Sequence, residues 1–198
     1  MLDPVATLEL AEQVAAAARS LGFETALIGA AALAVHGYTR GTEDIDLACA
    51  VNPEGLGRLE RMLIDAGLQT RLNYPDDDDP LSGMLTVWAT EDADGVPVGT
   101  VDLVNFPQSS HTPACAAIER AEPLPGSALR CVGIADLIAL KLYAGGLVDH
   151  ADIVQLLLNS RSADLSMVRS VASPFGVGGI LEALIQQAEL SQRGARMR

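Results

Sequence analysis

The sequence predicts an α/β (α+β) fold, with a core of strands and helices followed by a helical carboxyl-terminal part. Strand-like apolar segments alternate with helix-like segments up to about residue 132, and only helical spacing follows. The chain has 198 residues, of which 49% are hydrophobic, so a sizeable aliphatic core can form. We therefore expect an α/β core over residues 1–132 and a helical region over residues 133–198 that packs on it.

The elements of the core region follow from apolar periodicity and from glycine and proline positions. Segments with apolar side chains at helical spacing predict helices over residues 4–21, 30–36 and 53–66. Short apolar or alternating segments predict strands over residues 23–28, 45–51, 68–74, 84–90 and 98–106. Asp92 to Gly95 is typical of a turn between the last two strands. The acidic run from Asp76 to Asp79, between prolines, predicts a solvated loop.

The carboxyl-terminal part shows helical spacing only. Apolar residues at intervals of three and four predict four helices, centred near Leu140, Leu156, Val168 and Leu184. No apolar run approaches the ~18–20 residues that a membrane span needs, and Met1 to Pro4 lacks the basic start of a signal peptide. We expect no membrane association and a cytoplasmic location.

Charge and cysteine content exclude several classes of function. The formal net charge is −13, which repels phosphate backbones, so direct binding to nucleic acid is expected to be weak. Cys49, Cys115 and Cys131 are far apart and show no CxxC spacing. A zinc site or a disulfide framework is therefore not expected, and buried apolar thiols are the preferred interpretation.

The stretch from Ala26 to Leu47 carries the chemical signal. A strand is expected to end at Gly29 and a helix to begin there, which exposes backbone N–H groups suited to a phosphate. Asp44 and Asp46 lie two residues apart on the next expected strand, so their side chains share one face. Adjacent carboxylates repel unless a cation lies between them, and Mg²⁺ with substrate phosphates is the usual solution.

This stretch resembles the nucleotidyltransferase (DNA polymerase β-like) superfamily, and within it the small bacterial proteins related to AbiEii-type toxins. The residues that follow the order of that superfamily are Gly29, Ala32, Gly37, Arg40, Thr42, Asp44 and Asp46. The resemblance implies a nucleotidyltransferase-like mixed sheet, a glycine turn that holds a triphosphate, and two metal-binding aspartates. It also implies a third carboxylate on a later strand, for which Asp102 is the match.

Later residues extend the resemblance to about residue 158. Lys141 matches a lysine that faces the nucleotide, and Asp149 and Asp152 match a following DxxD pair. The resemblance thus implies a nucleotide site made of Gly29, Ala30, Arg40, Thr42, Lys141, Asp149 and Asp152. It implies a catalytic and metal-binding set made of Asp44, Asp46 and Asp102. At position 30 the family prefers Gly or Ser, and Ala retains the backbone N–H but lacks the hydroxyl.

Several of these residues have a simpler interpretation. Arg40 is either a surface charge or a clamp on the loop near Asp44, and Lys141 is either a ligand for phosphate or a lysine at a helix edge. Asp149 and Asp152 suit a helix amino terminus as well as a binding pair.

The resemblance implies Mg²⁺-dependent transfer of a nucleotidyl group from a nucleoside triphosphate, ATP among the candidates, to an unidentified acceptor: RNA, protein or a small molecule. A toxin–antitoxin or defence system, with a cognate antitoxin or regulator protein as partner, is implied by analogy. The alternatives are an inactive protein of the same fold that binds a nucleotide or a partner, and an antitoxin-like modifier of a toxin.

Overall fold

The computed structural model describes residues 4–75, 81–108, 112–159 and 164–196. A mixed seven-stranded sheet lies at its centre, with strand order β3-β4-β7-β2-β1-β9-β8. The strands are β1 (Ala26–Leu27), β2 (Asp44–Cys49), β3 (Gln69–Asn73), β4 (Met84–Trp88), β7 (Thr100–Asn105), β8 (Glu122–Pro123) and β9 (Arg130–Cys131). A separate two-stranded hairpin joins β5 (Thr90–Glu91) to β6 (Pro97–Val98).

The middle of the sheet is a parallel pair flanked by antiparallel neighbours. β2 and β7 run parallel, while β4 pairs antiparallel with β7 and β1 pairs antiparallel with β2. In this register Leu47 pairs with Leu103, which pairs with Leu85, and all three side chains are fully buried. The intervening residues Asp46 and Asp102 also pair with each other, and they face the opposite side. One face of the sheet is therefore apolar and the other carries carboxylates.

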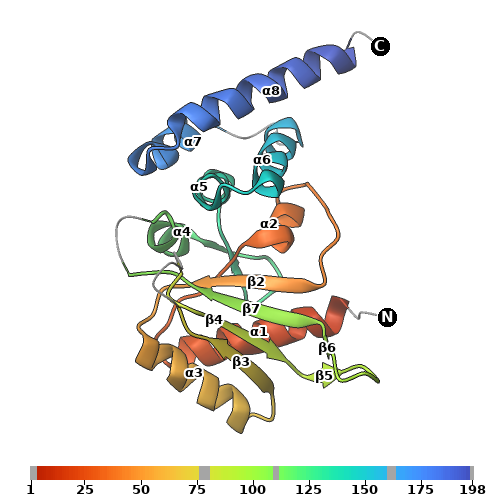
Figure 1. Ribbon diagram of the computed structural model, residues 1–198, viewed down its shortest axis with the longest axis vertical. Coiled ribbons are helices and arrows are strands. Elements are labelled where there is room, and N and C mark those ends of the chain that lie inside the picture. The colour runs from red at the N-terminus through yellow and green to blue at the C-terminus, as the bar shows by residue number, and fades with distance from the viewer. Residues whose placement is uncertain (1–3, 76–80, 109–111, 160–163, 197–198) are drawn as a thin grey trace.

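Helices cover both faces (Figure 1). α1 (Pro4–Ser20) packs on β2 and β7, and α3 (Pro53–Asp65) packs on β3. Both lie on the side of the sheet away from α2 (Gly29–Val35) and α4 (Ala114–Arg120). The layer beyond α2 holds α5 (Ile134–Ala144), α6 (Leu147–Asn159), α7 (Leu165–Ala172), the short 3₁₀ helix η1 (Ser173–Phe175) and α8 (Gly178–Arg196).

Local chemistry sets where these helices begin and end. Asn52 Oδ1 accepts a hydrogen bond from Gly55 N at 2.8 Å and caps α3, whose first residue is a proline. Asp164 caps α7 in the same manner by accepting from Ser166 N at 2.8 Å. α5 ends at Gly145, whose φ of 70° lies in the left-handed region that favours glycine.

The structure confirms the α/β (α+β) class with a mixed sheet. In the described residues all strands precede Gly133 and only helices follow it, although the division into regions 1–132 and 133–198 stays a prediction. A strand was expected over residues 23–28, but only the two residues of β1 form one. No element was assigned to residues 107–132, where α4, β8 and β9 occur. The acidic run at 76–79 falls outside the described residues, and none of the described helices is long and apolar enough to cross a membrane.

Candidate active site

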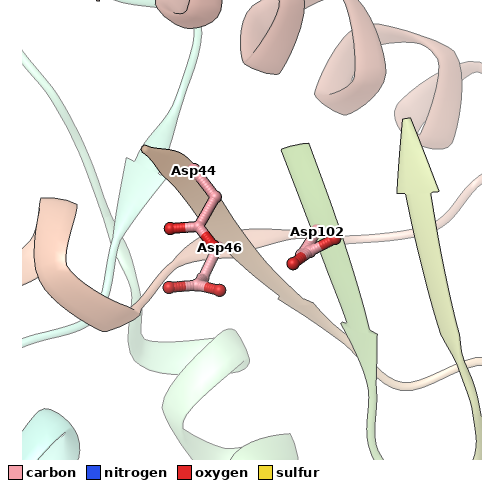
Figure 2. Close-up of side chains that lie close together, drawn as sticks. All are labelled: Asp44, Asp46 and Asp102. Atoms are coloured by element: carbon pink, nitrogen blue, oxygen red, sulfur yellow. The ribbon is translucent and has the colours of Figure 1, made fainter. Parts of the chain in front are cut away.

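Three carboxylates converge on the polar face of the sheet. Asp44 and Asp46 lie on β2, and Asp102 lies on the neighbouring strand β7 as the register partner of Asp46 (Figure 2). One carboxylate oxygen from each residue lies within 4.8 Å of the other two. The period of two along β2 and the parallel register with β7 together produce this cluster.

The turn that begins α2 lies against the same cluster. Gly29 has a φ of 61°, in the left-handed region, and a Cβ built there would lie 1.8 Å from Asp46 Oδ2. Glycine is thus required twice, for its backbone conformation and for the space that the Asp46 carboxylate fills. The backbone at the start of α2 is tied to β2 because Ile28 N donates a hydrogen bond to Asp46 O at 3.0 Å.

The surroundings of Asp46 shift the pKa of its carboxyl group. Its pKa is raised to about 6, first because burial disfavours the charged carboxylate and then because Asp44 and Asp102 repel it. Arg40 and Lys141 act in the opposite direction. A cation between the carboxylates would remove the repulsion, so the cluster is electrostatically suited to one.

The residues present fit a hard divalent cation. All three side chains offer oxygen atoms, which Mg²⁺ prefers, and their close approach needs a positive charge for balance. Asp102 Oδ1 is buried and has no hydrogen-bond partner among the described residues. A buried carboxylate oxygen without a partner costs free energy. Binding of a cation to this oxygen, or a hydrogen bond formed when the site is occupied, would remove that cost.

Thr42 and Arg40 fix the loop that leads into β2. The Thr42 hydroxyl donates a hydrogen bond to the Asp44 carboxylate, which holds this side chain in place. Arg40 Nε donates to Asp152 Oδ2 at 3.3 Å. Arg40 is therefore a clamp rather than a free surface charge, but it ties the loop to α6 and not to Asp44.

Lys141 is the centre of a buried ion-pair network. Its Nζ lies 2.7 Å from Asp152 Oδ2 and 2.9 Å from Asp149 Oδ1, and the Lys141 side chain is 8% exposed. The i, i+3 spacing of the two aspartates on α6 directs both toward α5. Asp152, itself 1% exposed, thus forms ion pairs with both Lys141 and Arg40. Lys141 is not the solvent-facing helix-edge lysine of the simpler interpretation.

A cavity of about 590 Å³ connects the Gly29 turn, Asp46 and Lys141, while Asp44, Asp102 and Thr42 are not among its lining residues. Gly29, Arg40, Asp46, Lys141 and Asp149 line its polar side. Its apolar wall was not identified from the sequence, because nothing in an apolar pattern separates cavity lining from core. The residues of that wall are Ile28, Leu81, Val104, Phe106, Leu137, Leu140, Tyr143 and Ala144.

The structure brings most of the expected site residues together, but two lie behind the surface. Ala30 is 3% exposed and does not line the cavity, so its methyl group is buried. Asp152 is enclosed by Lys141 and Arg40, so its part is to hold these cations. Gly29, Asp46, Lys141, Asp149 and Arg40 face the cavity directly.

Comparison with solved structures identifies the fold. An antigenic nucleotidyltransferase-like protein from Paracoccidioides brasiliensis is 16% identical, with a TM-score of 0.51 over 93% of this chain and 94% of that chain. ANT(2'')-Ia in complex with adenylyl-2''-tobramycin is 17% identical, with a TM-score of 0.52 over 85% of this chain and 95% of that chain. The solution structure of the antibiotic-resistance factor ANT(2'')-Ia is 18% identical, with a TM-score of 0.54 over 98% and 100% of the two chains.

These likenesses confirm that the chain has a nucleotidyltransferase-like fold. The resemblance to the AbiEii-type branch stays a prediction. No protein-family model matches the chain, and no curated protein matches it by sequence.

Proposed function

We propose that this protein is a divalent-metal-dependent nucleotidyltransferase that transfers a nucleotidyl group from a nucleoside triphosphate to an acceptor hydroxyl. The observation that supports this most is the convergence of Asp44, Asp46 and Asp102, with one oxygen of each within 4.8 Å, beside the Gly29 turn. The fold and this acidic triad fit nucleotidyl transfer.

In this proposal the triad holds Mg²⁺, which when bound neutralises charge on the triphosphate. Backbone N–H groups from Gly29 and Ala30 bind phosphate oxygens, and Lys141 offsets part of the phosphate charge. The acceptor oxygen forms a bond to the α-phosphorus, the bond from that phosphorus to the bridging oxygen breaks, and pyrophosphate leaves. Asp102 accepts the proton of the acceptor hydroxyl or serves only as a ligand. Catalysis of this kind depends on positioning and electrostatics.

The cavity next to the triad has room for the nucleotide. Its volume of about 590 Å³ lies within the range of small-molecule sites, and its apolar wall faces a polar side with Lys141 and Arg40. The net charge of −13 disfavours a polyanionic acceptor and favours a small molecule or a protein over RNA. ANT(2'')-Ia, of the same fold, is an antibiotic-resistance factor captured with an adenylylated aminoglycoside, which supports a small-molecule acceptor here.

One observation favours the alternative of a catalytically inactive nucleotide- or partner-binding module. Lys141 is paired with both Asp149 and Asp152, so its charge is already offset within the protein. Less positive charge then remains for a triphosphate. A cognate antitoxin or regulator as partner, and a toxin–antitoxin or defence context, stay predictions under either function.

The test compares the wild type with Asp46→Asn, and uses the exposed Asp65→Asn as a charge-matched control. Each protein is incubated with one α-³²P-labelled triphosphate (ATP, CTP, GTP or UTP), Mg²⁺ and a fractionated cell extract. We expect label in one fraction with wild type and Asp65→Asn, and a ~10²–10³-fold loss with Asp46→Asn, as is typical when one electrostatic stabiliser is removed. Binding of a triphosphate without transfer by any of the three proteins would favour the binding module instead.

A further inference from the structure

A threonine on β4 completes a row of polar side chains across three strands. Asp46 on β2 is the register partner of Asp102 on β7, and Asp102 is in turn the register partner of Thr86 on β4. Side chains of directly paired residues point to the same face of a sheet, with Cβ atoms ~5 Å apart. Thr86 therefore adjoins Asp102 on the side away from Asp46.

The two neighbours share an unusual property. Thr86 Oγ1 and Asp102 Oδ1 are both buried and both have no hydrogen-bond partner among the described residues. Thr86 is 3% exposed, so solvent does not satisfy its hydroxyl. The Thr86 hydroxyl can donate a hydrogen bond, and the Asp102 carboxylate oxygen can accept one. Leaving a buried polar group unpaired costs free energy, so their adjacency needs an explanation.

We propose that Thr86 is a positioning residue of the metal site, whose hydroxyl donates a hydrogen bond to the Asp102 carboxylate when the site is loaded. This inference rests on the proposed function, because it assumes that the triad binds a divalent cation. Metal-binding carboxylates are usually oriented by a hydrogen bond from a second residue. Thr42 already does this for Asp44, and Asp102 Oδ1 has no such donor within the described part of the chain.

Thr86 lies directly across from Asp102 on the side of β7 that faces away from the other two aspartates. The Asp102 carboxylate turns toward Asp44 and Asp46 on one side (Figure 2), and β4 lies on the other side of β7. The residues next to Thr86 along β4, Leu85 and Val87, point to the apolar face and carry no polar group. With the Cβ atoms of paired residues ~5 Å apart, a threonine hydroxyl and a carboxylate are within reach of each other by side-chain rotation.

The experiment measures binding of Mn²⁺ alone to the full chain, by following free Mn²⁺ with electron paramagnetic resonance. Thr86→Val removes the hydroxyl and keeps the branched shape. Thr86→Ser restores a hydroxyl and serves as the rescue variant. Thr112→Val is the matched control, because Thr112 Oγ1 is also buried without a partner among the described residues but Thr112 is not a register neighbour of the triad. Asp102→Asn tests the triad itself.

We expect Thr86→Val to weaken Mn²⁺ binding about tenfold, in the range typical of residues that orient metal ligands. Thr86→Ser and Thr112→Val should bind within about twofold of the wild type, well below that range. Thermal unfolding should show that both valine variants are at least as stable as the wild type, because each loses a buried hydroxyl for which the described residues offer no partner. Thr86→Ala replaces Thr86→Val if the latter does not fold.

Three outcomes would each overturn the role of Thr86, the metal site or both. Wild-type affinity in Thr86→Val, with Mn²⁺ binding lost in Asp102→Asn, would refute the role of Thr86 and leave the metal site intact. No Mn²⁺ binding by the wild type, or unchanged binding in Asp102→Asn, would refute the proposed metal site and the role of Thr86 with it. Equal weakening in Thr86→Val and Thr112→Val would assign the effect to general packing and refute the positioning role.

Discussion

Gly29 and Asp46 are in such close contact that no side chain fits between them. A Cβ at position 29 would lie 1.8 Å from Asp46 Oδ2 and 2.7 Å from Asp46 Cγ. The turn that is proposed to hold phosphates and the carboxylate that is proposed to hold the metal are therefore one structural unit, and a change in either is transmitted to the other.

Gly29→Ala should destabilise the protein and remove metal binding together. The left-handed conformation alone costs an alanine ~1–2 kcal/mol, and the steric clash adds to this or displaces the Asp46 carboxylate. Urea unfolding and Mn²⁺ titration measure the two effects. Gly22→Ala is the control, because Gly22 also has a positive φ, of 78°, but its Cβ would meet nothing within 4 Å. Equal losses of stability in both variants would show that the contact with Asp46 is unimportant.

Asp46→Asn should stabilise the metal-free protein at neutral pH. The pKa of Asp46 is raised from 3.8 to about 6, chiefly by burial and then by Asp44 and Asp102. The folded protein thus binds more protons than the unfolded chain between these values, and its stability falls as the pH rises through that window. Asparagine cannot ionise. At pH values above this window, the variant therefore avoids a loss of unfolding free energy on the order of 3 kcal/mol.

Urea unfolding in EDTA from pH 3.5 to 8 provides the measurement. The difference in unfolding free energy between Asp46→Asn and the wild type should be small at the acid end, grow through the window between 3.8 and about 6, and then level off. A difference that does not vary with pH would mean that the pKa of Asp46 is not raised in the folded protein.

Asp152→Asn should cost more stability than Asp149→Asn. The Asp152 side chain is 2% exposed and accepts from both Lys141 and Arg40, so its loss leaves two cations without a buried partner. Breaking a buried pair of this kind costs roughly 3 kcal/mol. The Asp149 side chain is 28% exposed and its loss leaves the Lys141–Asp152 pair intact, so about 1 kcal/mol or less is expected. Equal costs, measured by urea unfolding, would contradict the central place of Asp152.

The protein alone should bind bulk tRNA or duplex DNA weakly at physiological salt. The net charge of −13 opposes association with a phosphate backbone. A Kd weaker than about 100 µM is expected, at the weak end of non-specific binding. Filter binding at two salt concentrations checks this prediction. Tight binding that persists at high salt would show that local contacts outweigh the global charge, and would make RNA a favoured acceptor.

Most of the fold could be predicted where the chain carries a strong period. α1, α3, β2, β4 and β7 show clear apolar spacing, and the structure places them within a few residues of the expected bounds. α5 and α6 contain the apolar residues that predicted them. β1, β8 and β9 are two residues each, and such strands exist because a neighbour pairs with them rather than because of their own sequence. α4 was missed because its seven residues contain too few turns to show a period.

In the candidate site, too, some features can be predicted from the sequence and others depend on the fold. The i, i+2 spacing of Asp44 and Asp46 is visible in the sequence, and so is the glycine at the strand end. The pairing of Asp102 with Asp46 depends on which strands are neighbours, so it was expected only from the resemblance. Thr86 was not found, because threonine is ordinary in a strand and only the register reveals what it adjoins. The enclosure of Asp152 likewise depends on Arg40, more than a hundred residues earlier in the chain.

The parallel pairing of β2 with β7 has a consequence for the order in which the molecule acquires its chemistry. Between these strands the chain forms α3, β3, β4 and the β5–β6 hairpin before it returns to the centre of the sheet. Contacts between distant segments form late because closing a long loop must precede them. During synthesis, a nascent chain that ends before Asp102 has the glycine turn and two aspartates but no third carboxylate. The acidic triad can therefore arise only once this long excursion has folded back.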